Sequence, residues 1–169
     1  VAVPEDSRLL HEAREIPGLH AFAQTYPNGL RLRPARRRAC ARLRAYLEEH
    51  RFDIVHVNGS ADHRLVIAAL RGLQPRPLVV LTKHNTKPMR GLQHVWRARA
   101  GTDKVIAVCE FVRHQLSHTP YRRCRPETVY NGVDTAFYSP ADAADRVDAR
   151  QLWIGSNAGT ADYKGWTDL

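Results

Sequence analysis

Residues 76–85 read RPLVVLTKHN, and this short stretch decides the fold. Leu78 to Thr82 form a β-prone run of strand length, and the polar residues Lys83, His84 and Asn85 follow it at once. A strand that is apolar on both faces is typical of the interior of a parallel sheet that helices cover. The stretch therefore predicts a buried parallel strand whose carboxyl end opens onto polar side chains.

Three further runs of this kind lie along the chain, at residues 53–57, 104–108 and 127–130. Between the runs, apolar positions recur every three or four residues, which predicts helices. The helical stripes are Val66, Ala69, Leu70 and Leu73, then Leu92, Val95, Trp96 and Arg99, then Val112 and Leu116. This alternation predicts an α/β fold, a Rossmann-like parallel sheet with helices on both faces.

The two ends of the chain fit this scheme less completely. Residues 1–3 and 19–22 read as strands and residues 9–13 as a helix, while Asn131-Gly132 predicts a turn after the last run. Beyond it, residues 142–151 read as a short polar helix and residues 152–154 as a new strand. We expect residues 1–139 to form one domain and residues 140–169 a linker with the first strand of a second, so that the fold is incomplete at both ends.

Composition sets limits on the class of protein. The 169 residues carry a net charge of +9, but only four of the 26 basic residues are lysines and the arginines are spread along the chain. No apolar run is long enough to span a membrane, and because Glu5, Asp6 and Arg8 come early we expect no signal peptide in this sequence. The three cysteines lack the spacing of a zinc or redox motif, which predicts reduced thiols, no metal and a cytoplasmic location.

The densest basic run predicts a helix that starts near Pro34. Its apolar stripe is Ala35, Ala39, Leu43, Tyr46 and Leu47, which leaves Arg37, Arg38 and Arg44 on the opposite face. That face is either a solvated helix exterior or a surface for an anionic membrane or acidic ligand. Nucleic acid is disfavoured as a partner, because no aromatic residue interleaves the arginines before Tyr46.

Polar residues follow every predicted strand, where an open parallel sheet binds its ligands. The candidate binding residues are Asn58, Gly59, Ser60, Asp62, Lys83, Asn85, Glu110 and Asn131. Ser60 and Asp62 can also simply cap a helix, and Glu110 can be an ordinary helix start. His84 has no local helix to cap, which favours a role at the ligand, whereas His56 lies within a strand and is expected to be a core histidine bonded to a backbone group.

Three well-known motifs are absent: GxGxxG after a first strand, GxxxxGK[ST] and GxSxG. Their absence disfavours a dinucleotide-binding dehydrogenase, a P-loop enzyme and an α/β-hydrolase. The loop GSNAGTADYKG at residues 155–165 offers backbone amides and Lys164 as a phosphate cradle.

Five segments together resemble the retaining glycosyltransferases of family 4, which have the GT-B architecture. They are FDIVHVNGSADH, LVVLTKHN, DKVIAVCEFVRHQL, ETVYNGVDTAFYSP and IGSNAGTADYKGWTDL, and they run from about Phe52 to Leu169. In this resemblance residues 1–139 are the N-terminal, acceptor-side half of a GT-B fold. VYNGVDTAFYSP is similar to the family's link between its acceptor-side and donor-side domains. This similarity accounts for the turn that is predicted at Asn131-Gly132.

The resemblance implies an enzyme that moves a sugar from a nucleotide-sugar donor to a saccharide or lipid-linked acceptor, with retained anomeric configuration and without a metal. His84 matches the histidine at the donor sugar and phosphate, and Lys164 the basic residue at the donor diphosphate. Ser156 stands where members usually carry an arginine. We expect a role in bacterial surface glycan synthesis such as lipopolysaccharide, in the cytoplasm and peripherally on the membrane, and no activity of this chain alone.

Two other classes of function remain open at this point. One is a non-catalytic module that holds a nucleotide or glycan in the same crevice. The other is a GT-B-like nucleotide-sugar epimerase, whose catalytic acids would lie outside this sequence.

Overall fold

The structure is a computed structural model that describes residues 1–29 and 32–138. It divides into a compact unit, Val1–Asn131, and a second unit that begins at Gly132. The fold described below is that of Val1–Asn131. The helix predicted at residues 142–151, the strand at residues 152–154 and Lys164 lie outside the described residues, and the predicted boundary at residue 139 stays a prediction.

The main sheet has four parallel strands in the order β3-β4-β5-β6. Their bounds are Ile54–Val57 for β3, Leu78–Lys83 for β4, Lys104–Ala107 for β5 and Glu127–Thr128 for β6. The helices between them are Ser60–Ala69 (α3), Leu92–Ala100 (α4) and Glu110–Ser117 (α5), and a short 3-10 helix (η1), Pro120–Cys124, precedes β6. The predicted alternation of strands and helices is confirmed, whereas η1 was not predicted.

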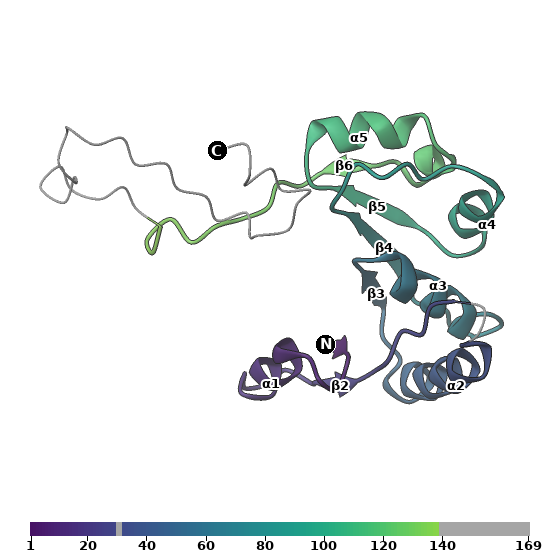
Figure 1. Cartoon of the computed structure of the whole chain (residues 1–169), viewed down its shortest axis with the longest axis vertical. Coiled ribbons are helices and arrows are strands. Elements are labelled where there is room, and N and C mark those ends of the chain that lie inside the picture. The colour runs from purple at the N-terminus through teal and green to yellow at the C-terminus, as the bar shows by residue number, and fades with distance from the viewer. Residues whose placement is uncertain (30–31, 139–169) are drawn as a thin grey trace, which may run out of the picture. The chain divides into compact units, whose positions relative to one another are not determined.

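The two faces of this sheet differ in burial. Val79, Leu81, Val105 and Ala107 are buried, while their neighbours on the other face, such as Ile106, are half-buried. In Figure 1, α3, α4 and α5 follow one another along the sheet. The fold class is confirmed: parallel strands flanked by helices, as in a Rossmann-like half of a GT-B fold.

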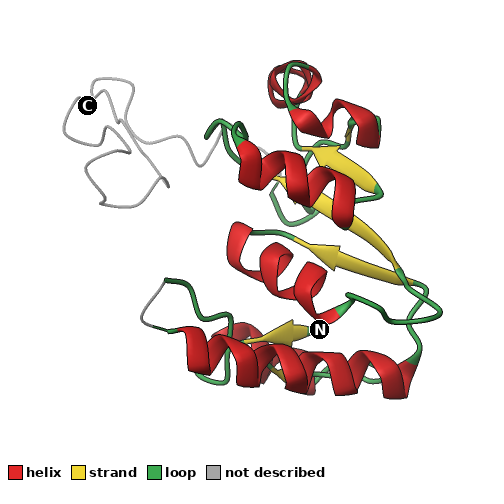
Figure 2. Ribbon diagram, turned by 90° about the vertical axis from the view of Figure 1, so that its right-hand side faces the viewer, coloured by secondary structure: helices red, strands yellow, loops and turns green. Residues whose placement is uncertain are grey.

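A second, two-stranded parallel sheet pairs Ala2–Val3 (β1) with Phe22–Ala23 (β2). It belongs to the N-terminal segment with Arg8–Arg14 (α1), and Arg33–His50 (α2) runs beside it (Figure 2). Side chains attach β2 to α2: the Phe22 ring stacks on Tyr46 with centroids 4.0 Å apart, and Gln24 Nε2 donates to the Ala39 carbonyl at 3.2 Å.

Helix α2 has the predicted apolar stripe, since Ala39, Leu43 and Leu47 are buried and Ala35 and Tyr46 are half-buried. Arg44, predicted on the face opposite the apolar stripe, is half-buried at the border of that face. Its Nη1 donates to the carbonyls of Ala69 and Arg71, at 3.1 and 2.7 Å, because α2 packs against the C-terminal end of α3.

The orientation of helix α4 differs most from its prediction. The predicted apolar face points outward, with Leu92 88% and Trp96 50% exposed, while His94, Arg97 and Ala98 are buried. Small residues decide the contact face: a Cβ on Gly101, at the end of α4, would come within 2.6 Å of Ile67 on α3. This close approach fixes the rotation of α4 and turns its polar side chains inward.

His56 also differs from its prediction as a core histidine bonded to the backbone. Its side chain is exposed, and its Nε2 lies 2.6 Å from the Thr82 hydroxyl. Among the described residues β3 pairs with β4 alone, so the other edge of β3 has no neighbouring strand to cover it.

Candidate active site

The polar ends of the strands lie at one edge of the sheet, as predicted. Ser60, His84, Glu110 and Asn131 follow β3, β4, β5 and β6 in turn. Since all three strand pairings are parallel, these residues share the carboxyl edge of one sheet. Ligands of open parallel sheets bind at this edge.

His84 and Asn58 form the first contact of the site. His84 Nε2 lies 3.1 Å from Asn58 Oδ1, and because an amide oxygen only accepts, the ring nitrogen donates. Both side chains are exposed, so their partner surface is open to a ligand. This contact ties the loop after β4 to the loop after β3.

Asp62 holds the β3–α3 loop in place. Its Oδ2 accepts hydrogen bonds from the backbone amides of Asn58 and Gly59, at 2.8 and 2.9 Å, and its Oδ1 accepts from the His63 amide at 2.8 Å. Asp62 thus caps the N-terminus of α3, where its negative charge is also favourable. The carboxylate thus supports the loop that carries Asn58, and the binding role proposed for Asp62 from sequence stays a prediction.

A cavity of about 260 Å³ opens beside this contact. Five of the candidate binding residues, together with His84, line it: Asn58, Gly59, Ser60, Lys83 and Asn85. Asp62, Glu110 and Asn131 do not line it. The structure therefore brings most of the predicted site together in one place and leaves these three side chains outside it.

Asn85 shapes the loop that follows β4. Its Oδ1 accepts from Lys83 Nζ at 2.5 Å and from the Lys87 amide at 3.1 Å. Burial lowers the pKa of Lys83, and the nearby charge of Lys87 lowers it further. Asn85 thus holds the Lys83 ammonium and the backbone of Lys87, and both lysines line the cavity.

Two buried polar residues of α4 that were not among the candidate binding residues, His94 and Arg97, line the cavity together with His63 of α3. His63 is buried and its Nε2 donates to the Thr102 hydroxyl at 2.9 Å, since that hydroxyl itself donates to the Arg97 carbonyl. Burial, aided by the charge of Arg97, lowers the pKa of His63 to about 4, so its ring is neutral. For His94 and Arg97, a signal in the sequence was their spacing, three residues apart on one helix face.

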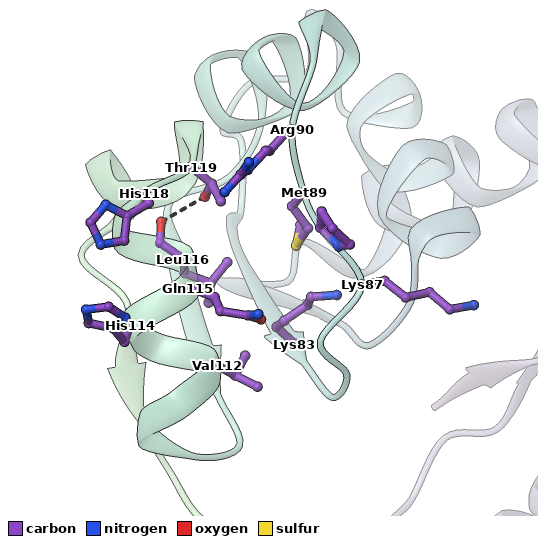
Figure 3. A pocket seen from close by; sticks show the side chains of 11 residues that line it. Lys83, Lys87, Met89, Arg90, Val112, His114, Gln115, Leu116, His118 and Thr119 are labelled. Atoms are coloured by element: carbon purple, nitrogen blue, oxygen red, sulfur yellow. Dashed lines mark hydrogen bonds between the residues drawn. The ribbon is translucent and has the colours of Figure 1, made fainter. Parts of the chain in front are cut away.

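A second cavity of about 170 Å³ adjoins the first and shares Lys83, Lys87, Pro88 and Met89 with it. Figure 3 shows Val112, Gln115 and Leu116 of α5 on the side of the helix that faces Lys83 at the end of β4, while His114 and His118 lie on the far side of the helix. Side chains of α5 and Lys83 thus line opposite sides of this cavity.

Glu110 sits apart from both cavities, in the first turn of α5. Its carboxylate pairs with Arg113 at 2.7 Å, and the hydrogen bond from Arg113 holds the pKa of Glu110 below its usual value. Residues 1–29 and 32–138 contain no group of three or more His, Cys, Asp or Glu placed to hold a metal ion.

Comparison with known families finds one match over most of the chain. The family described as Glycosyltransferase Family 4 matches residues 1–137. No curated protein matches the chain.

Proposed function

The chain belongs to glycosyltransferase family 4, and from that premise we propose that it transfers a sugar from a nucleotide-sugar donor to a saccharide or lipid-linked acceptor, with retention of the anomeric configuration. The observation that carries the proposal is the His84–Asn58 contact at the carboxyl edge of the sheet, beside a cavity rich in polar groups. Polar groups that converge on such a cavity are typical of a substrate site.

His84 orients the donor sugar in this proposal. Because its Nε2 donates to Asn58, a neutral ring leaves Nδ1 as an acceptor for a sugar hydroxyl. The Asp62 cap fixes the loop of Asn58, so the ring is held before the substrate arrives. Through this positioned polar contact His84 stabilises the transition state, and it does not act as a nucleophile.

Departure of the nucleotide requires positive charge near the diphosphate, and no metal takes part in the proposed step. Lys164, which lies outside the described residues, is proposed as the donor-phosphate contact. The residues 140–169 are proposed to begin the domain that binds the donor.

The test is a transfer assay on the complete gene product. It is incubated with radiolabelled UDP-, GDP- and ADP-sugars and with cell-envelope extract as the source of acceptor, and the product's anomeric configuration is read by NMR. Transfer with retention supports the proposal. Nucleotide binding without release of the sugar would support a non-catalytic module, and conversion of the free nucleotide-sugar into an epimer would support an epimerase.

We also propose that the enzyme builds a bacterial surface glycan such as lipopolysaccharide, in the cytoplasm and peripherally on the membrane. Within residues 1–29 and 32–138 no helix is both long and apolar enough to cross a membrane. Arg36, Arg37 and Arg38 on α2 are exposed. A cluster of exposed basic side chains suits the anionic surface of a membrane.

Binding to anionic vesicles is expected to depend on this cluster and on salt. The protein should sediment with vesicles that contain phosphatidylglycerol at low salt, and changing Arg36, Arg37 and Arg38 to Glu should abolish this, since each basic residue contributes about 1 kcal/mol. Arg122→Glu, an exposed change outside α2, is the control. Equal sedimentation with neutral and anionic vesicles would show that the cluster is a solvated helix face.

A further inference from the structure

Arg97 carries a charge that no acidic group balances. Its side chain is 3% exposed, and its Nη1 and Nη2 donate to Ser60 Oγ and Gln93 Oε1, at 2.9 and 3.3 Å. Within the described part of the chain no carboxylate lies at ion-pair distance from it. Buried charges are normally paired, so an unpaired buried guanidinium indicates a missing anion.

The charges around Arg97 increase this imbalance. Lys83 and Lys87 line the same cavity, and so does His94. Burial, with the charges of Arg97 and Lys83, lowers the pKa of His94, and burial lowers the pKa of Arg97 itself. Such shifts arise where cations are close to each other and partly removed from water.

The cavity that these cations line has no acidic residue among its described lining residues. Its wall adds neutral donors from the Ser60 hydroxyl and the Asn58 and Asn85 side chains. At about 260 Å³ the cavity has room for several water molecules, at about 30 Å³ each, and hence for a small anion.

We propose that Arg97, Lys83 and Lys87 form a subsite for a phosphate monoester carried by the acceptor of the transfer reaction. A phosphate monoester has close to two negative charges at neutral pH and several acceptor oxygens, which suits a cluster of three cations and a hydroxyl. Arg97 supplies a planar fork of donors and the two lysines supply mobile point charges.

The assignment to the acceptor, unlike the anion site itself, rests on the proposed function. In that proposal His84 faces the donor sugar, and the cavity with Arg97 extends from His84 through residues of the same unit. A phosphate there would hold the acceptor with its nucleophilic hydroxyl directed at the sugar that His84 orients.

The first experiment measures binding of inorganic phosphate to the full chain by isothermal titration, with chloride at equal ionic strength as the reference. Arg97→Met keeps the length of the side chain and removes the charge, and it should weaken phosphate binding at least tenfold. Arg99→Met, on the same helix but exposed, is the matched control and should change it less than twofold. Phosphate should raise the Tm of the unchanged protein and of Arg99→Met, but not that of Arg97→Met.

Lys87→Met provides the second variant in case Arg97→Met does not fold. Lys87 is exposed, so its loss leaves the packing intact, and phosphate binding should weaken severalfold. The subsite is refuted if the folded protein binds no phosphate, or if Arg97→Met and Lys87→Met bind it as the unchanged protein does.

Competition experiments identify the source of the phosphate. Displacement of inorganic phosphate by glucose 6-phosphate supports a saccharide phosphate, and displacement by short-chain phosphatidic acid supports a lipid phosphate. A different result would overturn the assignment to the acceptor. If UDP displaces phosphate, neither monoester does, and Arg97→Met abolishes the effect of UDP, the cavity belongs to the donor.

The inference and the proposed function fail independently. Phosphate binding that depends on Arg97, in a complete gene product that transfers no sugar, would keep the anion site and reject the function. Transfer to neutral acceptors by a protein without phosphate affinity would keep the proposed function and reject the anion site.

Discussion

His84→Ala is expected to lower sugar transfer by the complete gene product about a hundredfold or more, the range seen when one preorganised polar contact to a transition state is lost. The ring is exposed and bonded at 3.1 Å to Asn58, so its removal takes away a contact to the substrate without opening the core. The loss should appear mainly in kcat, because a contact that strengthens in the transition state does little for substrate binding.

The matched control is His56→Ala. His56 is an exposed histidine at the end of a neighbouring strand, with its own hydroxyl partner at 2.6 Å, but it does not line the cavity. Its replacement should leave kcat within about twofold. Unchanged turnover in His84→Ala would remove this histidine from the site, and equal losses in both variants would point to a general effect of losing a surface ring.

Acid is expected to destabilise the fold through His63. The buried ring has its pKa lowered from 6.5 to about 4, first by burial and then by the charge of Arg97, with Asp62 opposing and His94 adding to the shift. Above pH 6.5 the ring is neutral in both the folded and the unfolded chain, so it contributes nothing to the pH dependence.

As the pH falls from about 6.5 to about 4, the unfolded chain takes up a proton at this position and the folded chain does not. The free energy of unfolding therefore decreases over this window, by about 3 kcal/mol at its end, because the pKa of His63 is about 4 when folded and 6.5 when unfolded. Below about pH 4 both states are protonated and this source of instability stops growing.

Urea denaturation at several pH values measures the effect, and His63→Gln isolates it. The glutamine amide can donate to the Thr102 hydroxyl as the ring does, but it takes up no proton. The slope of stability against pH between 6.5 and 4 should be smaller in this variant. Parallel slopes in the two proteins would mean that His63 titrates normally when folded.

The parallel sheet was predictable because its strands are short apolar runs that end in polar residues. Val79 and Leu81 are buried as their positions in the run indicate, and the strand order follows the order of the runs along the chain. The topology then places His84 beside Asn58, although no local pattern links two residues 26 positions apart. Rules for sheets therefore predict where a site lies better than which side chains meet there.

Helix α4 shows why the remainder of the site was not predictable. Periodicity assigns the inner face to apolar residues, whereas Leu92 and Trp96 point outward and Arg97 inward. The rotation depends on how closely Ala98 and Gly101 approach α3, which is a matter of packing and not of pattern. Burying the charge of Arg97 costs free energy, although its guanidinium donates to Ser60 and Gln93, and a scale of average hydrophobicity does not favour placing an arginine on the inner face.

The two-stranded sheet of β1 and β2 has a consequence for local unfolding of the protein. Within the described residues its strands pair only with each other and not with the four-stranded sheet, and its attachment comes from side chains such as Phe22 on Tyr46 and Gln24 on the Ala39 carbonyl. A segment held in this way can detach as one cooperative unit while the remaining strands keep their ladders. We therefore expect the N-terminal segment to open as a foldon of its own, with backbone amides that lose protection at a lower free energy than those of β4 and β5.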